Sequence, residues 1–421
     1  MYQIEVWALL RVTVGGIVDA PATVSVTDMT DAQTYLQLIS HDGGRAGASG
    51  TESLESLSGG GSTDARETLL DRLRTEIAYV ERKADVDIDE TGVERLIAQA
   101  DDGLRRILDD GADAQLPPTA ISGLEAVVRT DGSRPVLFVE DDYVDVLAPS
   151  IGNYANDLSV VKEGVRAVCR SVGRVDDPSS QLGYQGTAWA IAEGVVATNY
   201  HVLEAIAPGG VRDGDRFEGR LITGAAVHFG HEVNNPLPER RFPIRRVISV
   251  GRQGGAQFAH PEVHKLNFDG LDLAILELEP VPGRNFPPPL PTARGDDPRT
   301  RGALASAGRG VYVVGYPGDQ HSTTPDLFAT LFASVKSYKR LAPGVVLDAA
   351  GDVPHDPRGW VLTHDASTLG GNSGSAVVDL DGDGRTLLAL HFAGHHARTN
   401  WAHALERITT ELAPVLPPLA T

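Results

Sequence analysis

Apolar side chains recur at helical spacing in two stretches of the first third of the chain. In the first stretch they are Leu69, Leu70, Leu73, Ile77 and Val80. In the second they are Val93, Leu96, Ile97, Ala100, Leu104, Ile107 and Leu108, with a capping box, Thr91-x-x-Glu94, at the start. Residues three and four apart share one face of a helix, so each stretch predicts an amphipathic helix. Because Gly111 and Pro117-Pro118 follow, we expect a helical hairpin that ends there.

Other patterns surround this hairpin. Residues 1–40 contain β-rich stretches and then a short helical candidate, DAQTYLQLI. Residues 41–63 are rich in Gly and Ser, which predicts a flexible linker or a long loop. Residues 134–146 have strand character, and residues 155–172 show the spacing of another amphipathic helix.

From about residue 172 the pattern changes to short apolar runs separated by Gly, Pro and Asp, as in LDLAILELE and GVYVVGYPG. Short runs bounded by turn residues are typical of an antiparallel barrel protein. Residues 279–298 interrupt the pattern with a high density of proline, so we expect them to connect two barrels.

The predicted fold class is an all-β double β-barrel domain preceded by a small α+β N-terminal region with a helical hairpin. The predicted organisation is a small β-rich module at 1–40, a Gly/Ser-rich linker at 41–63, the helical hairpin and a connector at 64–150, a lead-in helix at 151–171 and the double barrel at 172–415.

Charge is distributed unevenly between these parts. Residues 1–150 carry 28 acidic and 12 basic side chains and the rest of the chain carries 29 and 25, for a net charge of −20. An acidic surface repels phosphates, so we expect no nucleic-acid partner. The asymmetry instead suggests that residues 1–150 serve a separate purpose, such as binding a regulatory protein.

Three further features bear on location. No apolar run is long enough to cross a bilayer, so we expect no membrane partner. The N-terminal stretch lacks the basic leader and continuous apolar segment of a secretory signal. The single cysteine, Cys169, cannot form an intrachain disulfide, and its place in an apolar stripe predicts a buried structural thiol. Together these features favour a cytoplasmic protein.

Candidate chemistry lies beside the apolar runs, in the order His, Asp, Ser. His201 follows the strand-like segment GTAWAIAEGVVATN, which gives an imidazole a rigid seat at a strand end. Asp272 heads the apolar run LAILEL, where a buried carboxylate can fix the tautomer of an imidazole. Asp269 is a competitor, but it lies in the preceding loop rather than at the head of the run.

The third candidate is Ser373 in STLGGNSGSAVV, where Gly371 and Gly374 leave the backbone free to bend. A serine hydroxyl becomes a nucleophile when a neighbouring base takes its proton. The N–H groups of Gly371 and Ser373 can face the oxygen that becomes negative during acyl transfer. Ser375 is a competitor that lies on the strand entered next.

These three segments, with VYVVGYPG and LLALHFAG, resemble the bacterial trypsin-like serine peptidases, the chymotrypsin-fold group that includes the HtrA proteases and the glutamyl endopeptidases. The resemblance covers roughly residues 172–415, and we expect no PDZ domain after it, unlike in HtrA proteins. It implies a serine endopeptidase acting on proteins or peptides, with His201 as general base, Asp272 as its orienter and Ser373 as nucleophile. Gly371 and Ser373 would form the oxyanion hole. The alternative is a catalytically silent barrel that serves as a binding or adaptor protein.

The resemblance also suggests a substrate preference. Glutamyl endopeptidases hold an acidic side chain with a Thr shortly before the nucleophile and a His on a later strand, and the matching positions are Thr368 and His391. A hydroxyl and an imidazolium can bind a carboxylate through charge-assisted hydrogen bonds. Cleavage after acidic residues is therefore one hypothesis, and a purely structural role for both residues is the other.

Neither a metal nor a cofactor is expected. The acidic residues at 379, 381 and 383 resemble the start of a calcium loop, but Leu390 occupies the twelfth position, so a hairpin turn is the better prediction. The histidines at 391, 395, 396 and 403 lack helical zinc-ligand geometry, and His231-Glu232 lacks the second His of a zincin helix. There is no Gly-rich phosphate loop.

Overall fold

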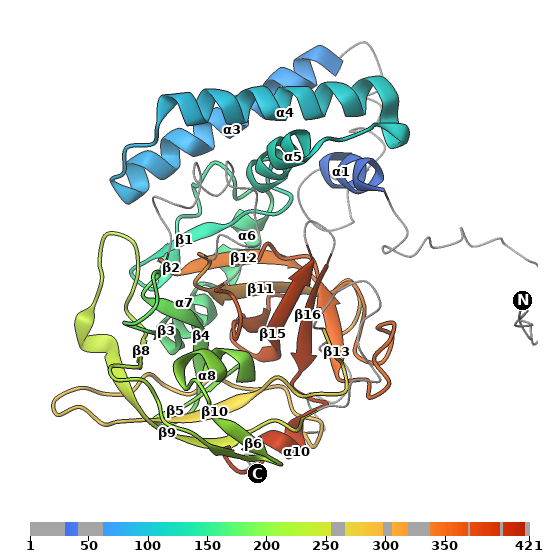
Figure 1. The fold of residues 1–421 in the computed structure, drawn as a ribbon. Coiled ribbons are helices and arrows are strands. Elements are labelled where there is room, and N and C mark those ends of the chain that lie inside the picture. The colour runs from blue at the N-terminus through green and yellow to red at the C-terminus, as the bar shows by residue number, and fades with distance from the viewer. Residues whose placement is uncertain are drawn as a thin grey trace, which may run out of the picture.

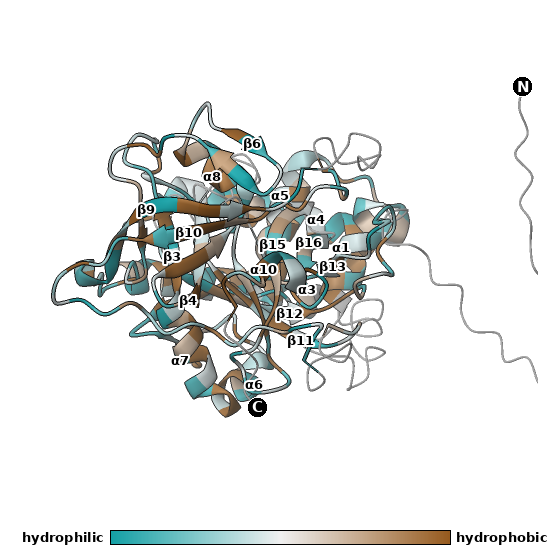
Figure 2. Cartoon of the chain, turned by 90° about the horizontal axis from the view of Figure 1, so that it is seen from below, coloured by the Kyte–Doolittle hydropathy of each residue, from teal (hydrophilic) through white to brown (hydrophobic). Residues whose placement is uncertain are grey.

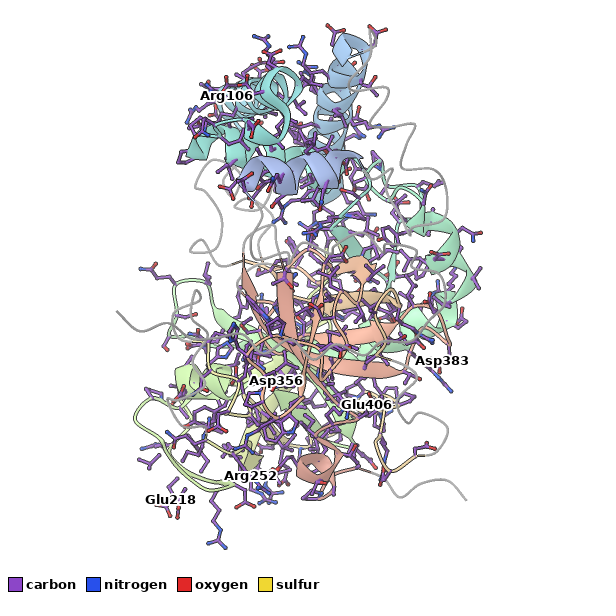
Figure 3. All side chains as sticks on the ribbon, turned by 90° about the vertical axis from the view of Figure 1, so that its right-hand side faces the viewer. Arg106, Glu218, Arg252, Asp356, Asp383 and Glu406 are labelled. Atoms are coloured by element: carbon purple, nitrogen blue, oxygen red, sulfur yellow. The ribbon has the colours of Figure 1, made fainter. Side chains whose placement is uncertain are left out.

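The computed structural model describes residues 30–40, 62–253, 266–297, 305–318, 337–368, 371–395 and 399–416. A layer of helices from the first third of the chain lies above two packed β-structures (Figure 1). A side view shows the same two parts, with Arg106 in the helical layer and Asp383 and Glu406 among the strands (Figure 3). The β-rich pattern of the first 29 residues and all but the end of the predicted linker lie outside the described residues.

The helical layer contains the predicted hairpin. Its helices are α1 (Asp31–Ser40), α3 (Ser62–Ala84), α4 (Glu90–Asp110) and α5 (Pro118–Thr130), followed by the short strands β1 (Leu137–Glu140) and β2 (Tyr143–Val144). The apolar faces of α3 and α4 are buried as predicted, with Leu73 and Leu96 fully covered. The predicted capping box at Thr91 is wrong, because the Asp89 carboxylate caps α4 by accepting the N–H groups of Thr91 and Gly92.

Helix α5 begins at Pro118, where the sequence pattern predicts the end of the helices. Proline is tolerated at the first position of a helix, since the N–H that it lacks would have no partner there. Pro118 therefore starts α5 instead of ending the helical layer. α5 packs so closely on α4 that a Cβ at Gly123 would lie 2.2 Å from the backbone of Ala100.

The first barrel is closed by antiparallel strands in the order β10-β5-β4-β3-β8-β9. These strands are β3 (Val172–Asp176), β4 (Tyr184–Ala192), β5 (Val195–Thr198), β8 (Ala226–His228), β9 (Arg241–Val250) and β10 (Ala274–Leu278). Helix α8 (Tyr200–Ile206) follows β5 directly, and a small hairpin of β6 (Val211–Asp213) and β7 (Arg216–Glu218) lies beside the barrel. Strand β10 is largely hydrophobic, which fits its burial in the barrel (Figure 2).

The second β-structure is a sheet in the order β13-β16-β15-β14-β11-β12-β1-β2. Its strands from the C-terminal half are β11 (Gly310–Gly315), β12 (Arg340–Val345), β13 (Val361–His364), β14 (Ala376–Asp379), β15 (Leu387–His395) and β16 (Thr399–Ala404). A bridge between Val346 and His364 joins the end of β12 to β13, so these strands curl into a second barrel. The predicted double β-barrel is confirmed.

Strand β1 extends the second barrel from outside the segment assigned to it. Leu137 pairs with Leu341, and Phe138 pairs with Arg340, so a strand from the predicted connector adds to the edge of β12. Edge strands expose unpaired backbone groups, and β1 covers those of β12. The helical layer is therefore joined to the second barrel through the sheet itself.

The predicted lead-in helix is interrupted at Val161, which separates α6 (Tyr154–Val160) from α7 (Lys162–Ser171). The proline-rich segment runs from the first barrel, where the N–H of Leu290 donates to the carbonyl of Ala190, to the second, where the N–H of Ala293 donates to that of Leu387. A short helix, α10 (Thr409–Leu412), lies near the end of the described chain.

A buried ion pair, Lys339–Glu232, lies where the two barrels meet. The Lys339 ammonium is 0% exposed and donates to the Glu232 carboxylate at 2.8 Å and to the carbonyls of Cys169 and Phe229 at 2.5 and 2.6 Å. These partners come from α7 and from the loop after β8, while Lys339 precedes β12. The Cys169 thiol is buried as predicted, and burial raises its pKa.

Candidate active site

His201 and Asp272 meet on the first barrel. His201 is the second residue of α8, and Asp272 lies just before β10, a strand paired with β5. The His201 Nδ1 lies 2.6 Å from one oxygen of Asp272, and the backbone N–H of His201 donates to the other at 3.0 Å. The carboxylate thus binds both the ring and the backbone of the same histidine, which fixes the orientation of the imidazole.

His201 and Asp272 shift each other's pKa so that the protonated imidazole and the carboxylate are both stabilised. Burial alone would raise the pKa of Asp272, but the charge and hydrogen bonds of His201 hold it below its ordinary value. Burial opposes protonation of His201, yet the charge of Asp272 and their hydrogen bond raise the pKa of His201 above its ordinary value of 6.5. The His201 side chain remains 45% exposed, so the other face of the ring is open to substrate and solvent.

The peptide unit of Asp272 is also held by two side chains. Asn199 donates its Nδ2 to the Asp272 carbonyl at 2.9 Å, and the Asp272 N–H donates to the Nε2 of His403 at 3.1 Å. Asn199 belongs to the first barrel and His403 to β16 of the second. The sequence pattern did not mark Asn199 as a site residue, although it stands two residues before His201, and His403 was weighed only as a zinc ligand.

The competing acid has a different partner. Asp269 accepts hydrogen bonds from Nε and an Nη nitrogen of Arg358 at 2.7 and 2.5 Å. Its carboxylate therefore forms an ion pair with a loop of the second barrel, whereas Asp272 contacts the imidazole of His201.

Ser373 lies in a tight loop between two glycines with left-handed backbone. Gly371 has φ of +87° and Gly374 has φ of +86°, a region that residues with a Cβ rarely adopt. Neither the N–H of Gly371 nor that of Ser373 donates a hydrogen bond within the described part of the chain.

Contacts with β4 hold this loop on the first barrel. Thr187 donates its N–H to the Ser373 carbonyl at 2.8 Å and its hydroxyl to the Gly371 carbonyl at 2.9 Å. A Cβ at Gly374 would lie 2.0 Å from the Thr187 carbonyl oxygen and 2.6 Å from the hydroxyl of Thr198, so only glycine permits this approach.

The same contacts bring the Ser373 loop to the segment that carries His201. Thr198 ends β5 three residues before His201 and donates its hydroxyl to the Thr187 carbonyl at 2.6 Å. A Cβ at Gly186 would lie 2.7 Å from Val202 and 2.9 Å from the Ser373 carbonyl oxygen. Among the described residues, no hydrogen bond joins the Ser373 hydroxyl to the His201 ring, a bond that often tightens only when substrate binds.

Ser375, the competing serine, points elsewhere. Its side chain is fully buried, and its hydroxyl would lie 2.0 Å from a Cβ at Gly315. It donates weakly to the side chain of Asn372, at 3.4 Å. Ser375 is therefore a packing residue at the start of β14, with no route to a substrate.

Thr368 and His391 lie on neighbouring parts of the second barrel. Thr368 donates its hydroxyl to the side-chain oxygen of Asn400, and a Cβ at Gly394 would lie 3.2 Å from that hydroxyl. The Nδ1 of His391 lies 3.3 Å from the Nε2 of His364. Burial lowers the pKa of His391 to about 3, with the positive charge of His201 acting in the same direction, so its ring is neutral at ordinary pH.

The acidic triplet belongs to a hairpin turn. Asp379 forms an ion pair with Arg309, Asp381 accepts the N–H of Gly310, and Asp383 accepts the N–H of Arg385. These carboxylates tie together the turn between β14 and β15. Across the described ranges, no cluster of three or more His, Cys, Asp or Glu side chains has the arrangement of a metal site.

The comparisons with known proteins agree with the fold. Residues 186–385 match the family described as trypsin-like peptidase domain. The chain is 31% identical over 336 residues to a probable serine protease of Lysobacter enzymogenes. The aligned region covers 75% of this chain and 81% of that relative. The chain belongs to the trypsin-like serine peptidases. It is a serine endopeptidase, a hydrolase whose substrates are proteins or peptides.

Solved structures give a weaker likeness. The peptidase is 20% identical to the inactive form of the Rv3671c protease, over 61% of this chain and 95% of that one, with a TM-score of 0.34. It is also 20% identical to the active form of that protease from M. tuberculosis, over 62% and 89% of the two chains, with a TM-score of 0.33. None of the helices in the described ranges is long and apolar enough to span a membrane.

Proposed function

We propose that His201, Asp272 and Ser373 are the catalytic triad of this peptidase. The observation that carries the proposal is the clasp of His201 by both oxygens of Asp272, beside a glycine-flanked serine. Asp272 orients the imidazole and stabilises its positive charge, so His201 can act as the general base for Ser373. The raised pKa of His201 suits this task, because a base works best when its pKa lies near the working pH.

In this mechanism the Ser373 oxygen attacks the peptide carbonyl while His201 takes the hydroxyl proton. The carbonyl oxygen becomes negative and accepts hydrogen bonds from the N–H groups of Gly371 and Ser373. The C–N bond then breaks as His201 returns the proton to the leaving amine, which leaves an acyl-enzyme. Water, deprotonated by His201, attacks the ester, and Ser373 recovers its proton as the product acid departs.

A fluorophosphonate probe tests the nucleophile. The probe reacts covalently with an activated serine, so we expect labelling of the wild-type enzyme and none of Ser373→Ala. Ser375→Ala is the matched control, since this serine lies two residues away and is buried. Labelling that persists in Ser373→Ala and disappears in Ser375→Ala would identify Ser375 as the nucleophile and contradict the proposal.

We also propose that the enzyme prefers to cleave after acidic residues. Thr368 and His391 support this, because they offer a hydroxyl and an imidazole close to Gly394, Asn400 and His364. The low pKa of His391 means that its ring is neutral before substrate binds. A substrate carboxylate would accept hydrogen bonds from the ring and the hydroxyl, and its negative charge would favour protonation of His391.

A peptide library with all residues at the position before the cleaved bond tests this preference. We expect cleavage after Glu or Asp in the wild type, and a loss of about tenfold or more in that preference in Thr368→Val and in His391→Phe. Variant Thr386→Val, which alters the hairpin turn of the second barrel, is the control. A wild-type preference for large apolar or basic residues would contradict the proposal.

We further propose that the helical layer controls activity from behind the Ser373 loop, and that a regulatory protein bound to residues 1–150 acts through this contact. Ser367, just before the specificity threonine, donates its hydroxyl to the carbonyl of Arg134, which follows α5. A small space of about 10 Å³ is lined by Arg129 of α5 and by Asn372, the neighbour of Ser373. The hydrogen bond and the shared lining support a link between the helical layer and the Ser373 loop.

A point variant tests this control better than removal of the helical layer, because truncation would also uncover the edge of β12. Ser367→Ala removes the bond to Arg134, and we expect kcat/KM to fall about two- to tenfold with the fold intact. Ser159→Ala removes a hydroxyl bond within the exposed helix α6 and is the control. Equal activity of both variants and the wild type would remove this contact as the route of control.

A cytoplasmic location completes the proposal. Cys169 is the single cysteine of the chain, so an oxidising compartment could not stabilise the fold with an intrachain disulfide. Fractionation of the native cells tests this, and recovery of the enzyme from the medium would contradict it.

A further inference from the structure

His403 contacts the backbone of Asp272, the acid of the proposed triad, from the second barrel. It belongs to β16, where it pairs with Leu390 and Val361 on the adjacent strands of the second barrel. The side chain is 1% exposed and stacks on the ring of Phe392, with centroids 4.2 Å apart and an angle of 12° between the rings. The ring is therefore enclosed by the protein and packed against Phe392.

The hydrogen bond between His403 and Asp272 has only one possible direction. A backbone N–H donates and cannot accept, so the Nε2 of His403 accepts the Asp272 N–H at 3.1 Å. This nitrogen therefore carries no proton, and the ring is the neutral tautomer with its hydrogen on Nδ1. Burial, opposed in part by the charge of Asp272, lowers the pKa of His403 to about 4, which agrees with a neutral ring.

The Asp272 peptide is thus fixed from two sides by two different barrels. Asn199 holds its carbonyl from the first barrel, and His403 holds the N–H of the same residue from the second. The carboxylate of Asp272 must reach both the ring and the backbone of His201. A rotation of the residue's backbone would break at least one of these two contacts.

We propose that His403 is a positioning residue, which fixes Asp272 so that its carboxylate holds His201 in the reactive tautomer and orientation. The role needs an acceptor at this place, and a backbone N–H left without one in a buried site costs free energy that backbone movement can relieve. Because the acceptor comes from the second barrel, the position of the acid in the first barrel depends on how the two barrels pack. The inference rests on the proposed triad.

Two substitutions at one position separate the acceptor from the packing. His403→Gln keeps an oxygen that can accept the Asp272 N–H, whereas His403→Phe keeps a flat ring but has no acceptor. Displacement of a catalytic group by about an ångström costs up to about 100-fold in rate. We expect His403→Phe to lower kcat by about 10- to 100-fold with KM nearly unchanged, and His403→Gln to recover most of that loss.

The pH profile provides the readout that a purely structural role would not change. If Asp272 loses its alignment in His403→Phe, it stabilises the charged His201 less well, and the acidic limb of kcat/KM moves to lower pH. Phe392→Leu is the matched packing control, since it removes the ring stacked on His403 and leaves the acceptor in place. We expect this control to lower thermal stability without moving the acidic limb.

The possible results are distinct. A His403→Phe enzyme with the wild-type acidic limb and kcat would overturn the inference, and so would equal losses in His403→Gln and His403→Phe. If His403→Phe does not fold, His403→Leu, which also lacks an acceptor, replaces it: the inference predicts a shifted acidic limb in His403→Leu and not in His403→Gln, and a wild-type limb in both would overturn it. Full activity of Ser373→Ala in the same assay would instead refute the triad, whatever the His403 variants show.

Discussion

His201 on the first barrel and three histidines on the second barrel lie in opposite electrostatic settings. On the first barrel, His201 is half exposed and contacts a carboxylate, and its pKa is raised. On the second barrel, His364, His391 and His403 are all buried, and burial lowers the pKa of each. The difference shows how one side chain type can do two jobs within one site. A carboxylate partner makes a base, whereas burial makes a neutral hydrogen-bonding group.

The largest effect on this comparison is expected from removing the charge of the partner. In Asp272→Asn, the amide can no longer stabilise a positive imidazole, and it favours the wrong tautomer of His201. We expect kcat/KM to fall by about 10⁴-fold at neutral pH and the pKa of His201 to return towards or below its ordinary value. Steady-state kinetics across pH would measure both changes.

Asp269→Asn is the control for that experiment. This carboxylate lies three residues away and binds Arg358 instead of a histidine. Its loss removes an ion pair between the barrels but leaves the contacts of His201 intact, so we expect activity within a few-fold of the wild type. If the two variants had equal activity, Asp272 could not be the group that distinguishes His201 from the buried histidines.

The first barrel's share of the site was largely predictable from the sequence. The order of apolar runs placed His201 after a strand and Asp272 before one, and the antiparallel pairing of β5 with β10 brings these ends together. Short apolar runs separated by turn residues identify such strands because the barrel buries their side chains. The glycines around Ser373 were equally informative, since both adopt backbone that other residues avoid.

The second barrel's contributions were less predictable, because they depend on pairing between distant segments. His403 faces Asp272 across 131 residues of sequence, and nothing local marks it as more than a strand residue. Strand β1 joins β12 across about 200 residues, so the helical layer could not be placed from its own pattern. The start of α5 at Pro118 was unpredictable for a local reason, since proline both ends helices and begins them.

A smaller but still large effect is expected at the ion pair that holds the barrels together. The site needs a fixed geometry between the two barrels. Lys339, which precedes β12, donates three hydrogen bonds to groups of α7 and of the loop after β8. Lys339→Met leaves the Glu232 carboxylate buried without its cation. We expect the free energy of unfolding to fall by about 3–5 kcal/mol, measured by urea denaturation.

The double variant Lys339→Met, Glu232→Gln is the matched control, because it removes the stranded charge as well. Replacing both members of a buried pair costs less than breaking it, so we expect the double variant to regain part of the lost stability. A double variant as unstable as the single one would show that packing, and not charge, makes this position important.

The smallest effect tests the electrostatics of His201 without touching its partners. Glu204 lies on the exposed face of α8 one turn after His201, and its negative charge contributes to the raised pKa of that histidine. Glu204→Gln should therefore move the acidic limb of kcat/KM to lower pH by a few tenths of a pH unit, because exposed charges interact weakly. Glu218→Gln removes an exposed charge from β7 and should leave the limb in place.

Because salt screens exposed charges, the shift should shrink as ionic strength rises, while the much larger effect of Asp272, which binds the ring directly, should persist. A limb unchanged in Glu204→Gln at low salt would mean that His201 responds to Asp272 alone, and the contrast with the buried histidines would then rest on one contact.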